Sequence, residues 1–294
     1  MKKIIALTLA LLMAITCFAA CDAMPEAGGT ADEVQATGDG QTPTTDKQAN
    51  GDILTDKQNT IIVGYTIYEP MNYNDENGVL VGFDTELAQM VFENLGYEVI
   101  FQEIDWASKY TDLDSGTIDC VWNGFTANTA DDDGILRSEK VDFSYNYMEN
   151  RQVIVAKKDS GIAAATDLTG KIGAAEAGSA GATYGETFDG AIINPLTYQT
   201  DCLMEVNAGA ADFAIVDAQL AKSYCGQGDY ADLMIIEALS SEVEFYAIGF
   251  KKGSELVAQV NAQLEALAAD GTIAALAEKY GVATTAITDF SDQK

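Results

Sequence analysis

Residues 84–101 read DTELAQMVFENLGYEVIF and carry the helix-then-strand pattern that decides the fold class. This pattern predicts an amphipathic helix over residues 85–95, with Asp84 as its N-cap and Gly96 at its end. Residues 99–101, Val-Ile-Phe, then predict a strand. The apolar residues that recur at three- and four-residue spacing are Leu87, Ala88, Val91, Phe92 and Leu95.

The same alternation of strand and helix continues on both sides of this stretch. Residues 61–63 predict a strand before it, and residues 107–114 and 118–122 predict a short helix and a further strand after it. Such a series is typical of an open α/β sheet, and a second series predicts a second sheet-centred lobe. Its strands are expected near 171–173, 196–198 and 213–216, and its helices near Tyr184, over 201–208, and over 218–224 with Asp217 as cap.

Two further strand-like segments, residues 152–156 and 245–250, are long enough to cross from one lobe to the other. Two extended connections predict a hinge, and a cleft between hinged lobes is a natural small-molecule site. Two helices are expected after the second crossing, one between Ser254 and Gly271 and one over 272–280. We therefore assign residues 60–152 plus 247–294 to lobe 1 and residues 153–246 to lobe 2.

Composition excludes several classes of function. The 294 residues include 46 Asp and Glu, 16 Lys and Arg, and no histidine, for a formal charge of −30. Without imidazole there is no Ser-His-Asp or Cys-His mechanism and no histidine-based zinc site. Such an acidic surface repels a phosphate backbone, so nucleic acid is not an expected partner. The only arginines are Arg137 and Arg151.

The N-terminus reads as a targeting segment. Lys2 and Lys3 precede an apolar run over 4–15, which predicts a signal peptide over residues 1–20. The Ala-Ala-Cys ending resembles the lipobox of bacterial lipoproteins, which implies lipid attachment at Cys21; secretion without lipid is the alternative. Residues 21–59 are poor in apolar residues and predict a disordered tether.

Three cysteines remain in the body: Cys120, Cys202 and Cys225. Their odd number and wide spacing fit neither a disulfide framework nor a metal site. We expect buried thiols, and a bridge between Cys202 and Cys225 stays open as the alternative.

An ordered set of short motifs resembles the polar amino acid-binding proteins of ABC importers. The resemblance spans residues 61–281 and implies the type II periplasmic-binding-protein fold, with two α/β lobes joined by two hinge strands. It also implies an extracytoplasmic lipoprotein that captures an amino acid and delivers it to an ABC permease. The motifs are Tyr68–Tyr73, Gly78–Asp84, Ser115–Asp119, Asn123–Thr126, Val141–Ser144, Asp167–Lys171, Ala177–Ser179, Gly209–Asp212 with Asp217, and Tyr246–Phe250 with Lys252-Gly253.

The resemblance also implies how the ligand zwitterion is held. Asp217 would pair with the α-ammonium; the alternative, suggested by its place before a helix, is a simple cap without a ligand, and different oxygens could serve both roles. The backbone of Gly124, Thr126, and Ser179 at a helix start would bind the α-carboxylate.

The carboxylate clamp of the family is an arginine after the Gly-x-Thr turn. Counting forward from that turn, its position falls on Asp131, whereas counting back from the Asp-Phe-Ser motif it falls on Arg137. A six-residue acidic insertion around residues 131–134 reconciles the two counts, so Arg137 is the expected clamp. Arg151, or no guanidinium at all, are the alternatives.

Aromatic residues are expected to form the side-chain pocket. Tyr68 and Trp106 match positions that sandwich the ligand in relatives, and Asn123 could supply a polar group or part of the pocket wall. Glu69 and Glu176 could receive a basic side chain, so the charge of the ligand is left open. Further polar or wall residues could be Tyr65, Lys109 and Trp122.

Two other functions compete with transport. A dehydratase-type enzyme could use the same scaffold with a carboxylate as acid or base. A lipid-tethered sensor could bind amino acids without feeding a transporter. We expect a monomeric binding protein that is not an enzyme and uses no cofactor or metal.

Overall fold

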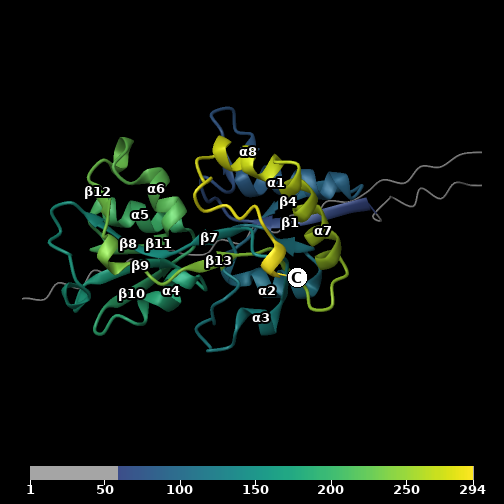
Figure 1. Ribbon diagram of the computed structural model, residues 1–294. Coiled ribbons are helices and arrows are strands. Elements are labelled where there is room, and N and C mark those ends of the chain that lie inside the picture. The colour runs from purple at the N-terminus through teal and green to yellow at the C-terminus, as the bar shows by residue number, and fades with distance from the viewer. Residues whose placement is uncertain (1–58, 294) are drawn as a thin grey trace, which may run out of the picture. The chain divides into compact units, whose positions relative to one another are not determined.

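The computed structural model describes residues 59–293 (Figure 1). The predicted signal peptide, Cys21 and all but the last residue of the predicted tether lie outside the described residues. Within residues 59–293, no helix is long and apolar enough to cross a membrane.

The first sheet has the strand order β4-β1-β5-β14-β6. β1 runs parallel to β4 and β5, and β14 returns antiparallel between β5 and β6. Helix α1 contacts β4 and also packs on α7 and α8, while α2 contacts β5. The elements are β1 (Thr60–Tyr65), α1 (Phe83–Asn94), β4 (Glu98–Glu103), α2 (Lys109–Ser115), β5 (Cys120–Val121), β6 (Asp142–Phe143), β14 (Gly249–Phe250), α7 (Leu256–Ala269) and α8 (Thr272–Lys279).

The second sheet has the order β10-β9-β11-β8-β12, with β9, β10 and β11 parallel. Helices α4 and α5 both contact β9 and β11 and lie on opposite sides of the sheet (Figure 1). The elements are β8 (Gln152–Lys157), β9 (Ile172–Glu176), α4 (Ala180–Gly185), β10 (Ile192–Leu196), α5 (Gln199–Ala208), β11 (Phe213–Asp217), α6 (Ala218–Tyr224) and β12 (Leu233–Ile235).

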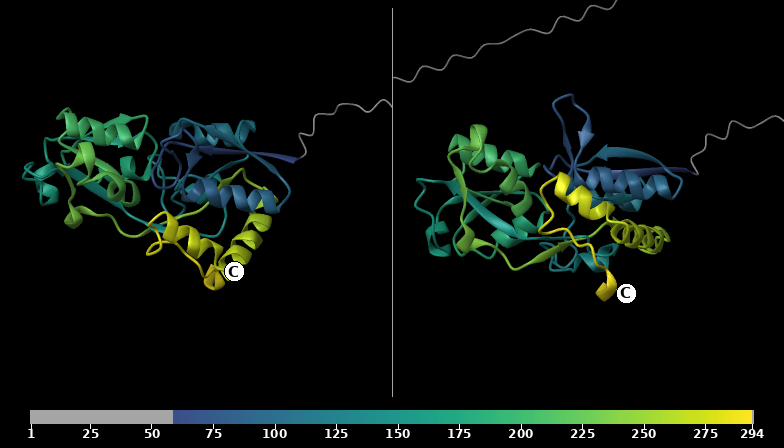
Figure 2. Two further views of the ribbon diagram at one scale, coloured as in Figure 1. Left: turned by 90° about the horizontal axis from the view of Figure 1, so that it is seen from above. Right: turned by 45° about the horizontal axis from the view of Figure 1, so that its top comes forward.

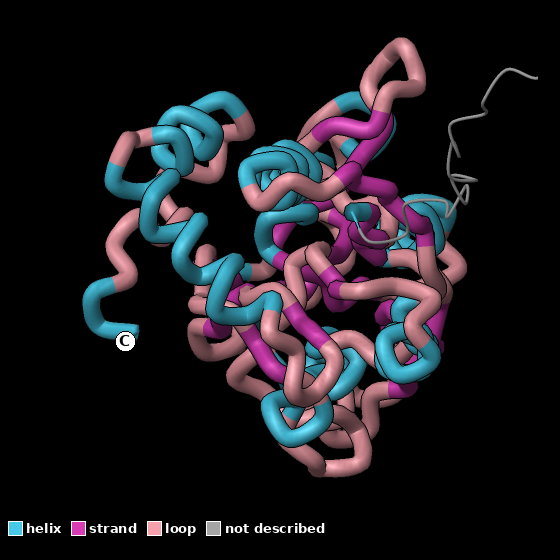
Figure 3. The backbone as a smooth tube through the Cα atoms, turned by 90° about the vertical axis from the view of Figure 1, so that its right-hand side faces the viewer, coloured by secondary structure: helices cyan, strands magenta, loops and turns pink. Residues whose placement is uncertain are grey.

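Short elements complete the chain. A two-stranded ribbon of β2 (Tyr73–Asn74) and β3 (Leu80–Val81) precedes α1. Helix α3 (Arg137–Lys140) leads into β6, and 3₁₀ turns occupy Trp106–Ser108, Ala165–Leu168, Gly228–Tyr230, Glu237–Leu239 and Ser291–Gln293. The tube view shows the strands enclosed by helices and loops (Figure 3).

The connection between the two sheets differs from the predicted one. Residues 152–156 do not cross between the lobes: β8 lies inside the second sheet, paired antiparallel with both β11 and β12. Its first five residues are buried, as an interior strand requires. The crossing is made instead by β7 (Met148–Asn150) and β13 (Glu244–Tyr246), which pair antiparallel between the sheets (Figure 2). The lobe boundaries given above stay our proposal.

Helix α1 begins differently from the prediction. Its N-cap is Gly82, with φ 131°, where a Cβ would lie 2.1 Å from the Met71 carbonyl oxygen. Asp84 lies inside the first turn, fully buried. Asp84 is therefore no cap, and its carboxylate is free to serve another part of lobe 1.

The three body cysteines are free thiols, with Cys120 and Cys202 buried and Cys225 half-buried. The alternative of a Cys202–Cys225 bridge is thus wrong.

Candidate functional site

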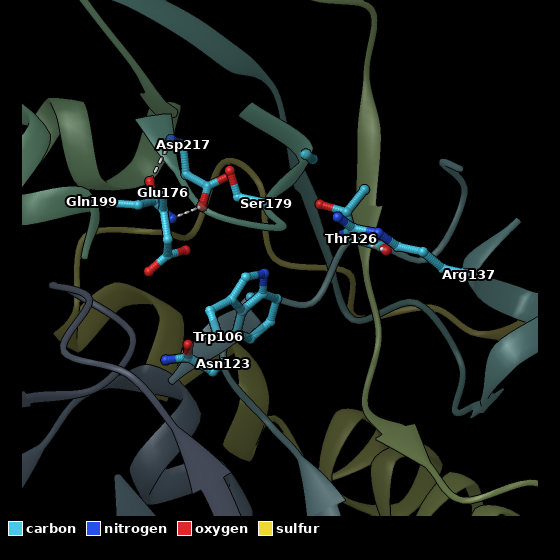
Figure 4. Close-up of a pocket in the computed structure, with 10 residues that line it drawn as sticks. Trp106, Asn123, Thr126, Arg137, Glu176, Ser179, Gln199 and Asp217 are labelled. Atoms are coloured by element: carbon cyan, nitrogen blue, oxygen red, sulfur yellow. Dashed lines mark hydrogen bonds between the residues drawn. The ribbon is translucent and has the colours of Figure 1, made fainter. Parts of the chain in front are cut away.

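One small cavity lies where the two sheets face each other (Figure 4). Its residues follow the carboxyl ends of parallel strands, the edge where open α/β sheets bind ligands. From lobe 1 the lining comprises Trp106, Asn123, Gly124, Thr126 and Arg137, and from lobe 2 Glu176, Ser179, Ala180, Gln199 and Asp217. Its volume is about 10 Å³, room for about one water molecule. The structure is therefore a closed form, in which the cavity has no room for an organic ligand.

Trp106 is positioned by the turn after β4. The Asp105 carboxylate accepts the Ala107 N–H at 3.1 Å, which starts the 3₁₀ turn carrying the indole. The Trp106 ring stands edge-on to Phe125, with centroids 5.2 Å apart. Its Nε1 has no hydrogen-bond partner within residues 59–293, so one donor of the cavity wall is free for a ligand.

The Gly124 turn follows β5 and is held by a hydrogen bond from its backbone to the buried side chain of Asp84. Gly124 has φ 57°, and its N–H donates to Asp84 Oδ2 at 2.8 Å. The side-chain amide of Asn123 is hydrogen-bonded within lobe 1. Its Nδ2 donates to the Thr66 carbonyl and to Asn72, and its Oδ1 accepts from the Thr66 hydroxyl. Asn123 thus lines the cavity, and its hydrogen bonds hold the turn.

Arg137 lies on α3 and is only 1% exposed. Its Nε donates to Asp131 Oδ1 at 2.8 Å, and its Nη atoms donate to the carbonyls of Thr126 and Gly178 at 3.3 and 3.4 Å. Lys140 also binds Asp131, at 2.8 Å. Burial opposes ionisation of Asp131, yet Arg137 and Lys140 hold the pKa of that carboxyl below its usual value. The acidic insertion therefore supplies the counterion of the arginine.

Asp217 ends β11 and is held by three side-chain amides. Asn150 and Gln152 donate to Oδ1 at 2.7 and 2.6 Å, and Gln199 donates to Oδ2 at 2.5 Å. Asp217 holds the predicted cap position before α6, but its side chain does not make the hydrogen bond of a cap. Burial raises the pKa of this carboxyl, and the amides only partly offset that shift.

Glu244 lies directly behind Asp217. The same two amides, Asn150 and Gln152, donate to Glu244 Oε1 at 2.6 and 2.7 Å. Burial and the charge of Asp217 raise the pKa of Glu244 to about 7. The two carboxylates share their donors, so the lobe 2 wall concentrates buried negative charge.

Ser179 precedes α4, and its hydroxyl oxygen accepts the Ala182 N–H at 3.0 Å. The side chain thus caps its own short helix as it faces the cavity. Next to it, the Gly178 carbonyl accepts from Lys109 Nζ at 3.0 Å and from Arg137, two cations of lobe 1. These bonds tie the two walls of the closed site together.

Tyr68 and Arg151 do not line the cavity. Tyr68 is buried behind the Gly124 turn, its hydroxyl 2.7 Å from that of Tyr246. Of the two aromatic residues predicted to sandwich the ligand, only Trp106 lines the cavity. Arg151 is exposed and donates to the Ser241 carbonyl. Seven of the eight predicted ligand residues line the cavity. Their roles in binding stay predictions.

Two lining residues, Ala180 and Gln199, were not considered from the sequence, and a third, Glu176, was considered only as a possible partner of a basic side chain. Glu176 ends β9, and Gln199 opens the helix after β10. Their place in the sequence could have identified Glu176 and Gln199, since both lie at or just after the carboxyl end of a strand of the second sheet.

Thermal stability should fall as pH rises from 5 to 7. Burial raises the pKa of Asp84 to about 7, although the Tyr147 hydroxyl and the Gly124 N–H oppose the shift. The folded state therefore binds a proton that the unfolded state releases near pH 4, so this stability is complete at low pH and is lost towards pH 7. We expect a loss of roughly 2 kcal/mol from this group between pH 5 and 7.

Calorimetric unfolding at both pH values tests this, with Asp84→Asn as the variant that keeps the shape of the side chain. The variant should show a flatter pH dependence than the wild-type protein. An equal or steeper slope in Asp84→Asn would contradict the assignment.

Two α/β lobes on a two-stranded connection, with a cavity at the carboxyl ends of both sets of parallel strands, define a type II periplasmic-binding-protein fold. The chain belongs to the bacterial extracellular solute-binding proteins, family 3, whose family model matches residues 61–283. The fold and the family expected from the sequence motifs are both confirmed.

Similar proteins agree with this family. The arginine-binding extracellular protein ArtP of Bacillus subtilis is 31% identical over 72% of this chain and 82% of its own length. A substrate-binding protein of an ABC uptake transporter from Streptococcus pneumoniae, solved with bound histidine, is 33% identical, with a TM-score of 0.68 over 75% of this chain and 92% of its own. An ancestral amino acid-binding protein, a precursor of cyclohexadienyl dehydratase, is 29% identical, with a TM-score of 0.67 over 76% and 96%.

Proposed function

We propose that this protein captures a free amino acid between its two lobes and delivers it to an ABC permease. The observation that carries the proposal is a buried carboxylate, Asp217, and a buried guanidinium, Arg137, lining one cavity from opposite lobes. A zwitterion presents one ammonium and one carboxylate, and each must find a partner when it leaves water.

The closed cavity suggests how capture works. The ligand would dock on lobe 1 at Trp106, Thr126 and Arg137 while the lobes are apart. Closure about β7 and β13 would then bring Ser179 and Asp217 onto it. A ligand drives this shift only through its higher affinity for the closed form, and the closed form is the state that a permease would recognise.

The remaining parts of the proposal concern location and partners. We propose a monomer that acts outside the cytoplasm, held at the membrane by lipid on Cys21 through the tether over 21–59. It binds without chemical turnover and needs no cofactor. The names of the arginine- and histidine-binding relatives support an amino acid as the ligand.

A thermal-shift screen of the common amino acids, cystine and small dipeptides tests this proposal, followed by calorimetry on each hit. We expect one chemical group of amino acids to raise the melting temperature. Incubation with hits, followed by chromatography, should return the compound unchanged, whereas a converted product would favour the dehydratase alternative. No stabilisation by any compound would overturn the proposal.

A further inference from the structure

Glu176 is the one acid of the cavity wall that carries an unpartnered oxygen. It ends β9, is 3% exposed, and lines the cavity together with Asp217. Its Oε1 has no hydrogen-bond partner within residues 59–293. Figure 4 shows its carboxylate directed across the cavity towards Trp106 and Asn123. A buried polar atom without a partner is costly, and a ligand group is one way to satisfy it.

The charged side chains that line the cavity also favour a ligand group that pairs with Glu176. Two carboxylates, Glu176 and Asp217, and one guanidinium, Arg137, line the cavity. Arg137 already has Asp131 as its ion-pair partner. A neutral zwitterion would pair its ammonium with Asp217 and would bring no cation to Glu176.

Burial and the charge of Asp217 raise the pKa of Glu176, and the charge of Lys109 only partly opposes this shift. Lys109 is 2% exposed and donates to the carbonyls of Trp106 and Gly178. Within the described part of the chain, no ion pair joins Lys109 to Glu176. A ligand that carries a second cation would supply the ion-pair partner that Glu176 lacks in the described chain.

We infer that Glu176 selects an amino acid with a cationic side chain, a guanidinium or an ammonium, by receiving that group in the closed cavity. The inference rests on the proposed function, since it assumes that Asp217 takes the α-ammonium. The indole of Trp106 lines the same cavity and already attracts one cation, since Lys109 Nζ lies 4.9 Å from the centre of its ring. Glu69, the other acid considered from the sequence, is not among the residues that line this cavity.

Calorimetry with arginine and citrulline isolates the charge, because citrulline replaces the guanidinium by a neutral ureido group on the same chain. Lysine and norleucine form a second pair for the ammonium. The wild-type protein should bind the cationic member of at least one pair at least tenfold more tightly than its neutral partner. In Glu176→Gln this preference should fall by at least tenfold. Glu98→Gln, the same change at an exposed site, should keep it.

The outcomes separate the two proposals. Tight binding of a neutral amino acid with no preference for a cationic one would overturn the role of Glu176 and leave the proposed function standing. An unchanged preference in Glu176→Gln would likewise overturn it. Binding of no amino acid at all would overturn both. Melting temperatures of the two variants check that each is folded.

Discussion

Asp217→Ala should weaken amino acid binding by roughly 30- to 4,000-fold, the largest loss expected from any single substitution in lobe 2. Removing one partner of a buried, hydrogen-bonded charge pair costs about 2–5 kcal/mol. The cost arises because the ligand ammonium would enter the closed cavity without its anion. Calorimetric titration of the variant with the amino acid that binds the wild-type protein measures the loss.

Stability without ligand separates this effect from misfolding. Burial raises the pKa of both Glu176 and Glu244, and the negative charge of Asp217 raises each of them further. Removal of Asp217 removes that charge, although three amides lose their acceptor. We therefore expect a small change in melting temperature beside a large loss of affinity. An affinity within threefold of the wild-type value would contradict the proposal that Asp217 pairs with the ligand ammonium.

Arg137→Ala should have a second large effect, on both affinity and stability. The ligand carboxylate would lose its guanidinium, with a cost of the same order, about 2–5 kcal/mol. The substitution also leaves Asp131 buried with Lys140 as its only ion-pair partner in the described chain. Breaking a buried ion pair destabilises a protein by roughly 3–5 kcal/mol. Affinity is measured by calorimetry, and stability by denaturant unfolding.

Arg151→Ala is the matched control, because it removes the other arginine of the chain at an exposed site outside the cavity. This variant should bind like the wild-type protein. The double variant Arg137→Ala with Asp131→Ala removes both members of the pair and should recover part of the lost stability while affinity stays low. Recovery of affinity in the double variant would show that Arg137 acts on the fold and does not contact the ligand.

Much of the site was predictable because its residues follow strands in recognisable motifs. Asp217, Trp106 and the Gly124 turn each come directly after a predicted strand, and parallel strands place such residues at one edge of a sheet. Arg137 was harder to predict, since an insertion shifts it from its expected spacing. The order of the motifs still placed it in the cavity wall.

Three features could not be predicted, and each depends on contacts distant in the sequence. β8 has the composition of any buried strand, so only its pairing with β11 and β12 shows that it does not cross between lobes. Asp84 looks like a helix cap, yet it braces the Gly124 turn 40 residues away. The ring of Tyr68 lies behind that turn because its hydroxyl meets Tyr246, 178 residues later.

The sequence by itself determined the fold class, the family and the strand ends that form the cavity, because apolar periodicity and turn residues are local properties of the chain. The sequence pointed to Asp217 among the 46 acidic side chains, but only the tertiary structure decided which of them are buried around the cavity. Burial depends on what packs around a carboxylate, and the elements around Glu176, Asp217 and Glu244 come from distant segments. Tertiary packing also places Asp131 of the acidic insertion beside Arg137 as its counterion. It leaves one oxygen of Glu176 facing the cavity without a hydrogen-bond partner in the described chain.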